Sequence, residues 1–222
     1  MYLLALAVLP PILIAYYVYR QDKYEKEPKR LIIKSFLFGC FAIIPAVVLE
    51  LIFNETLFPT LFLYVLFGIA FIEEGLKYFF LKKYMYVDKE FNEPMDGIVY
   101  AVMISLGFAT VENIAYVMLY ASPGEEMSVA ILRMFSAIPL HAACGVILGY
   151  YVGLAKFSKK KESELLYTGL AYATLVHAVY NYFLFASAGY YWIVSLIALL
   201  IAIYYSKKAI KLHQEDSRKR TQ

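Results

Sequence analysis

The sequence predicts an all-α fold, a polytopic membrane bundle of about seven transmembrane helices, and three observations lead to this class. Hydrophobic residues make up 62% of the 222 residues, well above the roughly 45–50% of ordinary soluble domains. Apolar runs of about 20 residues, long enough to cross a bilayer core, recur along the chain. Short charged or turn-forming stretches separate these runs. The composition therefore excludes a soluble globular domain.

The apolar runs are expected to form the spans in chain order. They cover residues 1–19, 31–53, 60–81, 95–120, 128–157, 164–187 and 190–205. The first run lacks a basic n-region and a small-residue cleavage site, so we expect it to be retained as a span. A tight hairpin at residues 186–189 joins the last two runs. We therefore expect residues 1–206 to form a single transmembrane domain, followed by a basic cytoplasmic tail at residues 207–222.

Lysine and arginine are concentrated in alternate connections between the runs. The stretches at residues 20–34, 82–89 and 156–161 are basic, as is the tail. The stretches at residues 54–59 and 121–127 contain no lysine or arginine. Because basic connections stay on the cytoplasmic side of a membrane, this pattern predicts an outside N-terminus and a cytoplasmic C-terminus.

The third run contains three charges near its centre, Glu73, Glu74 and Lys77. Each charge at that depth costs about 2.5–3.5 kcal/mol on insertion scales, so a partner or a hydrated cavity is needed. Glu73 and Lys77 are four residues apart and can form an ion pair on one helix face. We expect Glu74 to lack such a partner on its own helix and to depend on neighbouring spans.

Three further spans carry polar residues that we expect at a similar depth. Glu112 lies within the fourth run, His141 follows Pro139 in the fifth, and His177 and Asn181 are one helical turn apart in the sixth. A packing core does not need several carboxylates and imidazoles at one level, whereas a catalytic or metal centre does. The third to sixth spans are therefore predicted to meet at such a centre.

Other polar and small residues have structural interpretations. Gly145, Gly149 and Gly153 recur every four residues, a pattern that lets a neighbouring helix approach closely. Asp96 stands at the start of the fourth span, where a capping role and a catalytic role are both open. Arg133 either reaches toward the membrane surface or balances an acid such as Glu112.

The residues of the centre support two hydrolytic mechanisms. In one, His141, His177 and glutamates such as Glu73 and Glu112 bind a divalent metal, with zinc favoured, and Glu74 or Glu73 is the general base. In the other, which needs no metal, one glutamate activates water while the histidines and Asn181 stabilise the oxyanion. A proton-coupled transporter that relays protons along the same acids is the alternative from another class.

Four ordered motifs carry a family resemblance. They are E-E-x-x-K at residues 73–77, F-x-x-x-E-N at 108–113, H-x-x-x-G at 141–145 and H-x-x-x-N at 177–181. In this order they resemble the PrsW family of intramembrane proteases, whose core motifs are similar to those of CAAX prenyl endopeptidases and bacteriocin-processing proteins.

The resemblance implies a peptidase of a prokaryotic plasma membrane that cleaves membrane proteins, in some members the first cut of an anti-sigma factor. It points to Glu73, Glu74 and His177 as central residues, with Glu112, His141 and Asn181 beside them. The family has been classed both as metallopeptidase and as glutamic peptidase, so both mechanisms stay open. We expect a membrane-protein substrate and the lipid bilayer as partners, and no nucleic acid.

Overall fold

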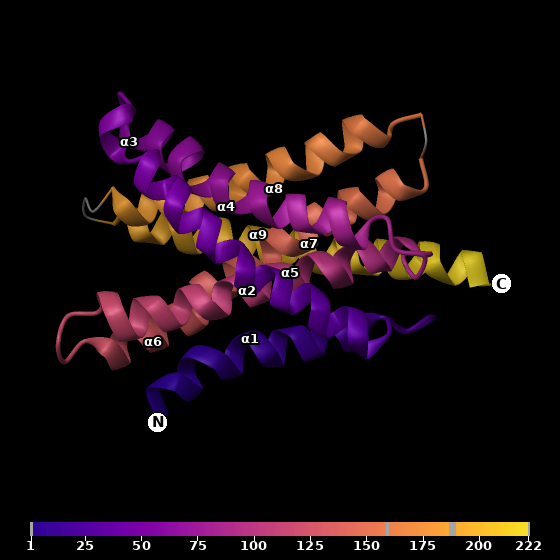
Figure 1. The fold of residues 1–222 in the computed structure, drawn as a ribbon, viewed down its shortest axis with the longest axis horizontal. Coiled ribbons are helices and arrows are strands. Elements are labelled where there is room, and N and C mark those ends of the chain that lie inside the picture. Colours follow the sequence, from indigo (N-terminus) through magenta and orange to yellow (C-terminus); the bar gives the residue numbers. More distant parts are fainter. Residues whose placement is uncertain (1, 159, 187–189, 222) are drawn as a thin grey trace.

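A computed structural model describes residues 2–158, 160–186 and 190–221, and in these ranges the fold is helical with no strand. The helices run side by side along the long axis of the molecule (Figure 1). The α-helices are α1 (Tyr2–Gln21), α2 (Lys29–Ile52), α3 (Leu61–Leu63), α4 (Phe71–Phe80), α5 (Pro94–Ala115), α6 (Glu126–Phe135), α7 (Ala137–Lys156), α8 (Glu162–Phe185) and α9 (Tyr191–Thr221). Short helical segments lie between them, namely η1 (Glu55–Leu57), η2 (Tyr64–Ala70), η3 (Leu81–Met85) and η4 (Tyr116–Tyr120).

Five helical stretches in the described part of the chain are long and apolar enough to cross a membrane. They are Tyr2–Gln21, Lys29–Ile52, Pro94–Tyr120, Glu126–Lys156 and Tyr191–Lys219. These stretches match the first, second, fourth, fifth and seventh predicted runs, so the prediction of an all-helical integral membrane protein is confirmed. The count of seven spans and the orientation of the termini stay predictions.

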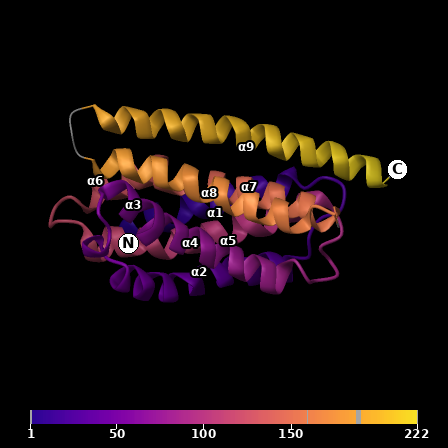
Figure 2. The ribbon, with the colours of Figure 1, turned by 90° about the horizontal axis from the view of Figure 1, so that it is seen from above.

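The connections between the helices lie at the two ends of the bundle (Figure 1). Figure 1 shows the N-terminus and the α5–α6 connection at one end, and the C-terminus and the α1–α2 connection at the other. The expected tail continues α9 as helix through Thr221. His213 in this segment is buried, and its Nε2 lies 2.9 Å from the backbone oxygen of Tyr150. In Figure 2, α9 lies along one edge of the bundle beside α8. Residues 187–189 of the predicted hairpin lie outside the described residues.

Helix α5 is the centre of the bundle. Every residue from Pro94 to Thr110 is buried, because α1, α2, α7 and α9 surround this stretch. Glycines allow α7 to approach: a Cβ at Gly149 would meet the Cα of Ile98 at 2.6 Å, and one at Gly153 would meet the backbone of Pro94. Gly145 likewise faces Val102 and Ser105. The close packing of α5 on α7 therefore depends on the absence of side chains at these positions.

Helix α5 begins with a capping box. Oδ2 of Asp96 accepts hydrogen bonds from the backbone N–H groups of Asn92 and Glu93, both at 2.8 Å. The carboxylate of Asp96 thus satisfies amides that the helix itself leaves unpaired. This contact supports the capping interpretation of Asp96.

Irregular helical turns surround the polar centre of the bundle. Helix α4 contains the three charges of the third run. The π-helical segments η2 and η3 precede and follow it. Such turns rotate the helix face that follows them and are frequent at functional sites. Helices α6 and α7 are separated at Ser136, since Pro139 has no N–H to donate to the carbonyl of Phe135. The helical stretch is therefore interrupted shortly before His141.

Candidate active site

Four buried side chains from three helices form the centre. Glu73 and Glu74 come from α4, His141 from α7 and His177 from α8. One ligand atom from each residue lies within 4.8 Å of the others. The π-helical segment η2 directly precedes α4, and the break before α7 lies shortly before His141. The sequence placed them at a similar depth on separate spans, and the structure brings them together.

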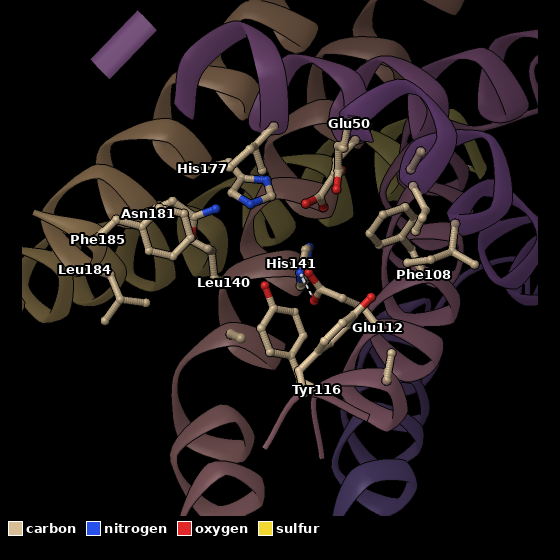
Figure 3. Close-up of a pocket in the computed structure, with 18 of the residues that line it drawn as sticks. Glu50, Phe108, Glu112, Tyr116, Leu140, His141, His177, Asn181, Leu184 and Phe185 are labelled. Carbon is tan, nitrogen blue, oxygen red and sulfur yellow. Dashed lines mark hydrogen bonds and ion pairs between the residues drawn. The ribbon is translucent and has the colours of Figure 1, made fainter. Parts of the chain in front are cut away.

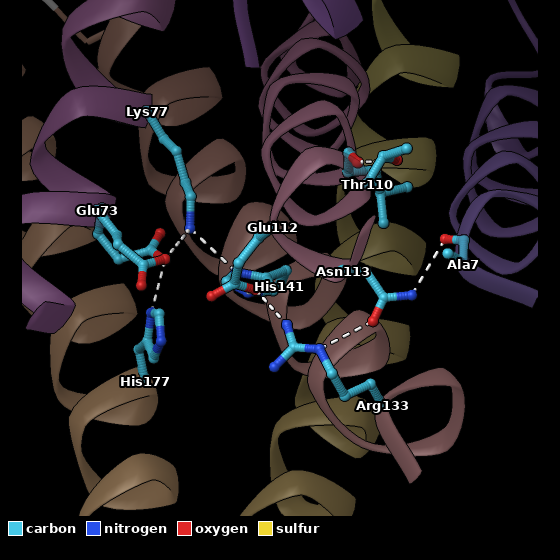
Figure 4. Close-up of polar contacts among 11 residues, drawn as sticks. Ala7, Glu73, Lys77, Thr110, Glu112, Asn113, Arg133, His141 and His177 are labelled. Atoms are coloured by element: carbon cyan, nitrogen blue, oxygen red, sulfur yellow. Dashed lines mark hydrogen bonds and ion pairs between the residues drawn. The ribbon is translucent and has the colours of Figure 1, made fainter. Parts of the chain in front are cut away.

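Lys77 lies at the middle of this cluster (Figure 4). Its Nζ is 2.8 Å from Oε1 of Glu74, 3.2 Å from Oε2 of Glu73 and 3.0 Å from Nδ1 of His141. The expectation that Glu74 lacks a partner on its own helix is wrong. Lys77 follows Glu74 by three residues and Glu73 by four, and it forms an ion pair with both. A single buried ammonium group thus neutralises part of the charge of two adjacent carboxylates.

The contacts of the two imidazoles assign their protons. Nδ1 of His141 faces the ammonium of Lys77, which can only donate, so this nitrogen accepts and Nε2 carries the hydrogen. That Nε2–H points to Oε2 of Glu112 at 3.0 Å. Nδ1 of His177 lies 3.0 Å from Oε1 of Glu74 and donates to it. In the neutral form of His177, Nε2 is then the nitrogen whose lone pair a ligand could bind.

A second polar group extends the centre along α5. Arg133 of α6 forms an ion pair with Glu112, and its Nε donates to Oδ1 of Asn113 at 2.8 Å (Figure 4). The amide nitrogen of Asn113 in turn donates to the backbone oxygen of Ala7 at 3.1 Å. Of the two interpretations of Arg133, the structure supports the balancing of Glu112. Glu112 itself contacts the four-residue cluster through His141 and is not a member of it.

A cavity of about 490 Å³ gives access to the centre (Figure 3). Of the adjacent glutamates, Glu73 lines this cavity, whereas Glu74 is fully enclosed at 0% exposure. Asn181, one turn after His177, also lines the wall. The cavity reaches Asn54, Tyr120 and Phe185, where α2, η4 and α8 end near the N-terminal end of the bundle. A ligand entering from that end would therefore meet Glu73 before Glu74.

Sequence reasoning missed one acidic residue of the cavity. Glu50, in the last turn of α2, lines the wall and points into the space in Figure 3. Its position near the end of an apolar run offers no motif. The available signal was an acid inside a predicted span, the feature that singled out Glu73 and Glu112.

The fold and the site together define an integral membrane protein whose helices hold a buried glutamate and histidine centre next to a polar cavity, as in hydrolytic enzymes that work within the bilayer. Residues 27–206 match the model of a family described as "PrsW family intramembrane metalloprotease". The match covers most of the chain. The protein therefore belongs to the PrsW family of intramembrane proteases, and the resemblance of the four motifs is confirmed.

Curated relatives agree over nearly their whole length. The protein is 34% identical to Protease PrsW of Geobacillus kaustophilus (strain HTA426) over 89% of this chain and 87% of the relative. It is 34% identical to Protease PrsW of Shouchella clausii (strain KSM-K16), over 93% and 96%. Protease PrsW of Bacillus subtilis (strain 168) is 31% identical over 91% of both chains. No solved structure gives a significant match.

The donor set of the cluster fits a divalent metal. Two carboxylates and two imidazoles are ligands that Zn²⁺ accepts in catalytic sites. Oε2 of Glu74 is buried and has no hydrogen-bond partner among the described residues, so a lone pair is available there. Lys77 occupies the same region, and a metal ion would compete with its ammonium group for the oxygens of Glu73 and Glu74.

Proposed function

We propose that this protein is an endopeptidase that hydrolyses peptide bonds of membrane-associated proteins within the plasma membrane. The observation that carries the proposal is the buried cluster of Glu73, Glu74, His141 and His177, which meets a cavity of about 490 Å³. Membership of a protease family supports the same reaction. The basic connections would face the cytoplasm, and the cavity would then open toward the outer side.

In the proposed centre, His141, His177 and Glu74 hold a divalent metal, with zinc favoured by the mixed nitrogen and oxygen donors. A bound metal of this kind supplies Lewis acidity to the peptide carbonyl. Glu112 orients His141 through the Nε2 hydrogen bond at 3.0 Å, a contact that fixes the tautomer of a ligand. Lys77 forms ion pairs with both glutamates when no metal is bound.

Glu73 is the proposed general base, because it is the glutamate of the pair that lines the cavity. It takes a proton from water as the water oxygen attacks the carbonyl carbon, and passes that proton to the amide nitrogen as the C–N bond breaks. The side-chain amide of Asn181 lies on the same wall and donates a hydrogen bond to the carbonyl oxygen. The position of Lys77 also supports a metal-free version, in which Glu73 is again the base and Asn181, together with His177, stabilises the oxyanion beside the ammonium group.

The test uses purified protein in proteoliposomes with a panel of labelled single-span membrane peptides, analysed for cleavage by mass spectrometry. Glu73→Gln and His177→Ala should each lower the cleavage rate by about 10²-fold or more. Glu55→Gln, an exposed carboxylate of η1 outside the cavity, is the matched control. Full activity of both site variants would contradict the proposal. Loss of activity with a chelator and its return with Zn²⁺ would select the metal mechanism, and chelator-resistant activity the glutamic one.

A further inference from the structure

Glu50 differs from the other acidic residues around the cavity in its lack of a partner. Glu73 is paired with Lys77, and Glu112 is paired with Arg133 and His141. Glu50 is partly buried, and among the described residues it has neither a hydrogen bond nor an ion pair. It also lies outside the four-residue cluster that can hold a metal.

Glu50 is an unpaired carboxylate in α2, a helix long and apolar enough to span the membrane. Such groups are costly in the bilayer and commonly mark a ligand path when they face a cavity. In Figure 3, Glu50 points into the cavity, on the wall across from Tyr116 and Asn181. The side chain is therefore placed to contact a segment that occupies the space in front of His177.

The surroundings of Glu50 favour a positively charged contact. The cations of the site, Lys77 and Arg133, are both held by other carboxylates. The connections at this end of the bundle, residues 53–60 and 121–125, contain the acidic residues Glu55 and Glu125 and no lysine or arginine. An unpaired carboxylate at an entrance whose connections contain no lysine or arginine is complementary to a basic side chain and would repel an acidic one.

We propose that Glu50 is a specificity-determining residue that binds a lysine or arginine side chain of the membrane-protein substrate close to the bond to be cut. The ammonium or guanidinium group donates hydrogen bonds to the carboxylate and completes the ion pair that Glu50 otherwise lacks. This inference rests on the proposed function and narrows its substrate class. Its failure would leave an intramembrane peptidase that selects substrates by other features.

Binding of synthetic peptides in nanodiscs tests the proposal separately from cleavage. The peptides share one apolar span and differ in a single residue, Lys, Ala or Glu, placed at successive positions through the end of the span. Fluorescence anisotropy is measured in the His177→Ala background, so that bound peptide is not hydrolysed. At the position nearest Glu50, the Lys peptide should bind about 10-fold more tightly than the Glu peptide.

Two variants and one control decide the outcome. Glu50→Gln should reduce the Lys-to-Glu affinity ratio to about 1, and Glu50→Lys should invert it. Glu55→Gln removes an exposed carboxylate at the same end and should leave the ratio unchanged. A ratio that survives both Glu50 substitutions, or falls equally with Glu55→Gln, would overturn the proposal. Equal binding of the three peptides by the protein with Glu50 intact would overturn it as well, since Glu50 would then merely reach water at the end of α2.

Discussion

Replacement of Lys77 by methionine should destabilise the metal-free protein strongly. The Lys77 side chain is 1% exposed, and its Nζ lies 2.8 Å from Glu74 and 3.2 Å from Glu73. Methionine retains most of the apolar stem but leaves two buried carboxylates without their cation. Removal of one partner from a buried ion pair costs about 3–5 kcal/mol, because the remaining charge is desolvated and unpaired. We therefore expect a loss of this size in the free energy of unfolding.

The measurement is unfolding of detergent-solubilised protein after treatment with a chelator, followed by titration with Zn²⁺. The exposed Lys83 on η3 provides the control, since Lys83→Met should change stability by less than about 0.5 kcal/mol. Added Zn²⁺ should restore much of the lost stability to Lys77→Met, because a metal that binds only the folded state supplies the missing positive charge. Equal stability of the two lysine variants in chelator would refute the role of Lys77 as the counter-ion of the centre.

Two further predictions concern parts of the molecule away from the centre. Burial, together with the charge of Asp22, raises the pKa of Glu27 from its usual 4.5 to about 7. The unfolded chain releases the Glu27 proton at a lower pH than the folded protein does, so the free energy of unfolding should fall as pH rises from about 4.5 to 7. Glu27→Gln should flatten this pH dependence in thermal unfolding. An unchanged pH dependence in the variant would contradict the role of Glu27. Gly149→Ala should lower the free energy of unfolding by about 1–3 kcal/mol, because the added Cβ would meet the backbone of α5. Gly75→Ala should be tolerated, because a Cβ added at Gly75 would meet no neighbouring atom within 4 Å. Equal melting temperatures of the two glycine variants would disprove the close packing inferred for α5 and α7.

The main features of the fold and centre could be predicted because polar residues are rare and costly within membrane-spanning segments and are easily recognised there. An apolar run of about 20 residues has few interpretations other than a span. Glu73, Glu74, His141 and His177 stand out as charges or imidazoles inside such runs, and the structure brings all four together. The family resemblance rested on four motifs that include these positions, and the match to the family model over residues 27–206 confirms it.

The details of the centre depend on side-chain geometry that spacing does not determine. Both Glu73 and Glu74 are within reach of Lys77 on one helix, and only the rotamers and the approach of His141 show that all three are contacted. Which glutamate lines the cavity depends on the rotation of α4 between its two π-helical neighbours, and no sequence period indicates that rotation. Glu50 resembles an ordinary residue at the end of a span until the cavity is seen around it.

The position of a bound metal is the sharpest test of the proposed centre. Crystals of active protein grown with Zn²⁺ would be measured on both sides of the zinc absorption edge. We predict one anomalous peak per chain among His141, His177 and Glu74, with Lys77 moved away from the glutamates, and no peak in crystals of His177→Ala. A peak elsewhere in the molecule, or active crystals in which Lys77 keeps its place and no anomalous signal appears at the cluster, would contradict the metal centre proposed for this protein.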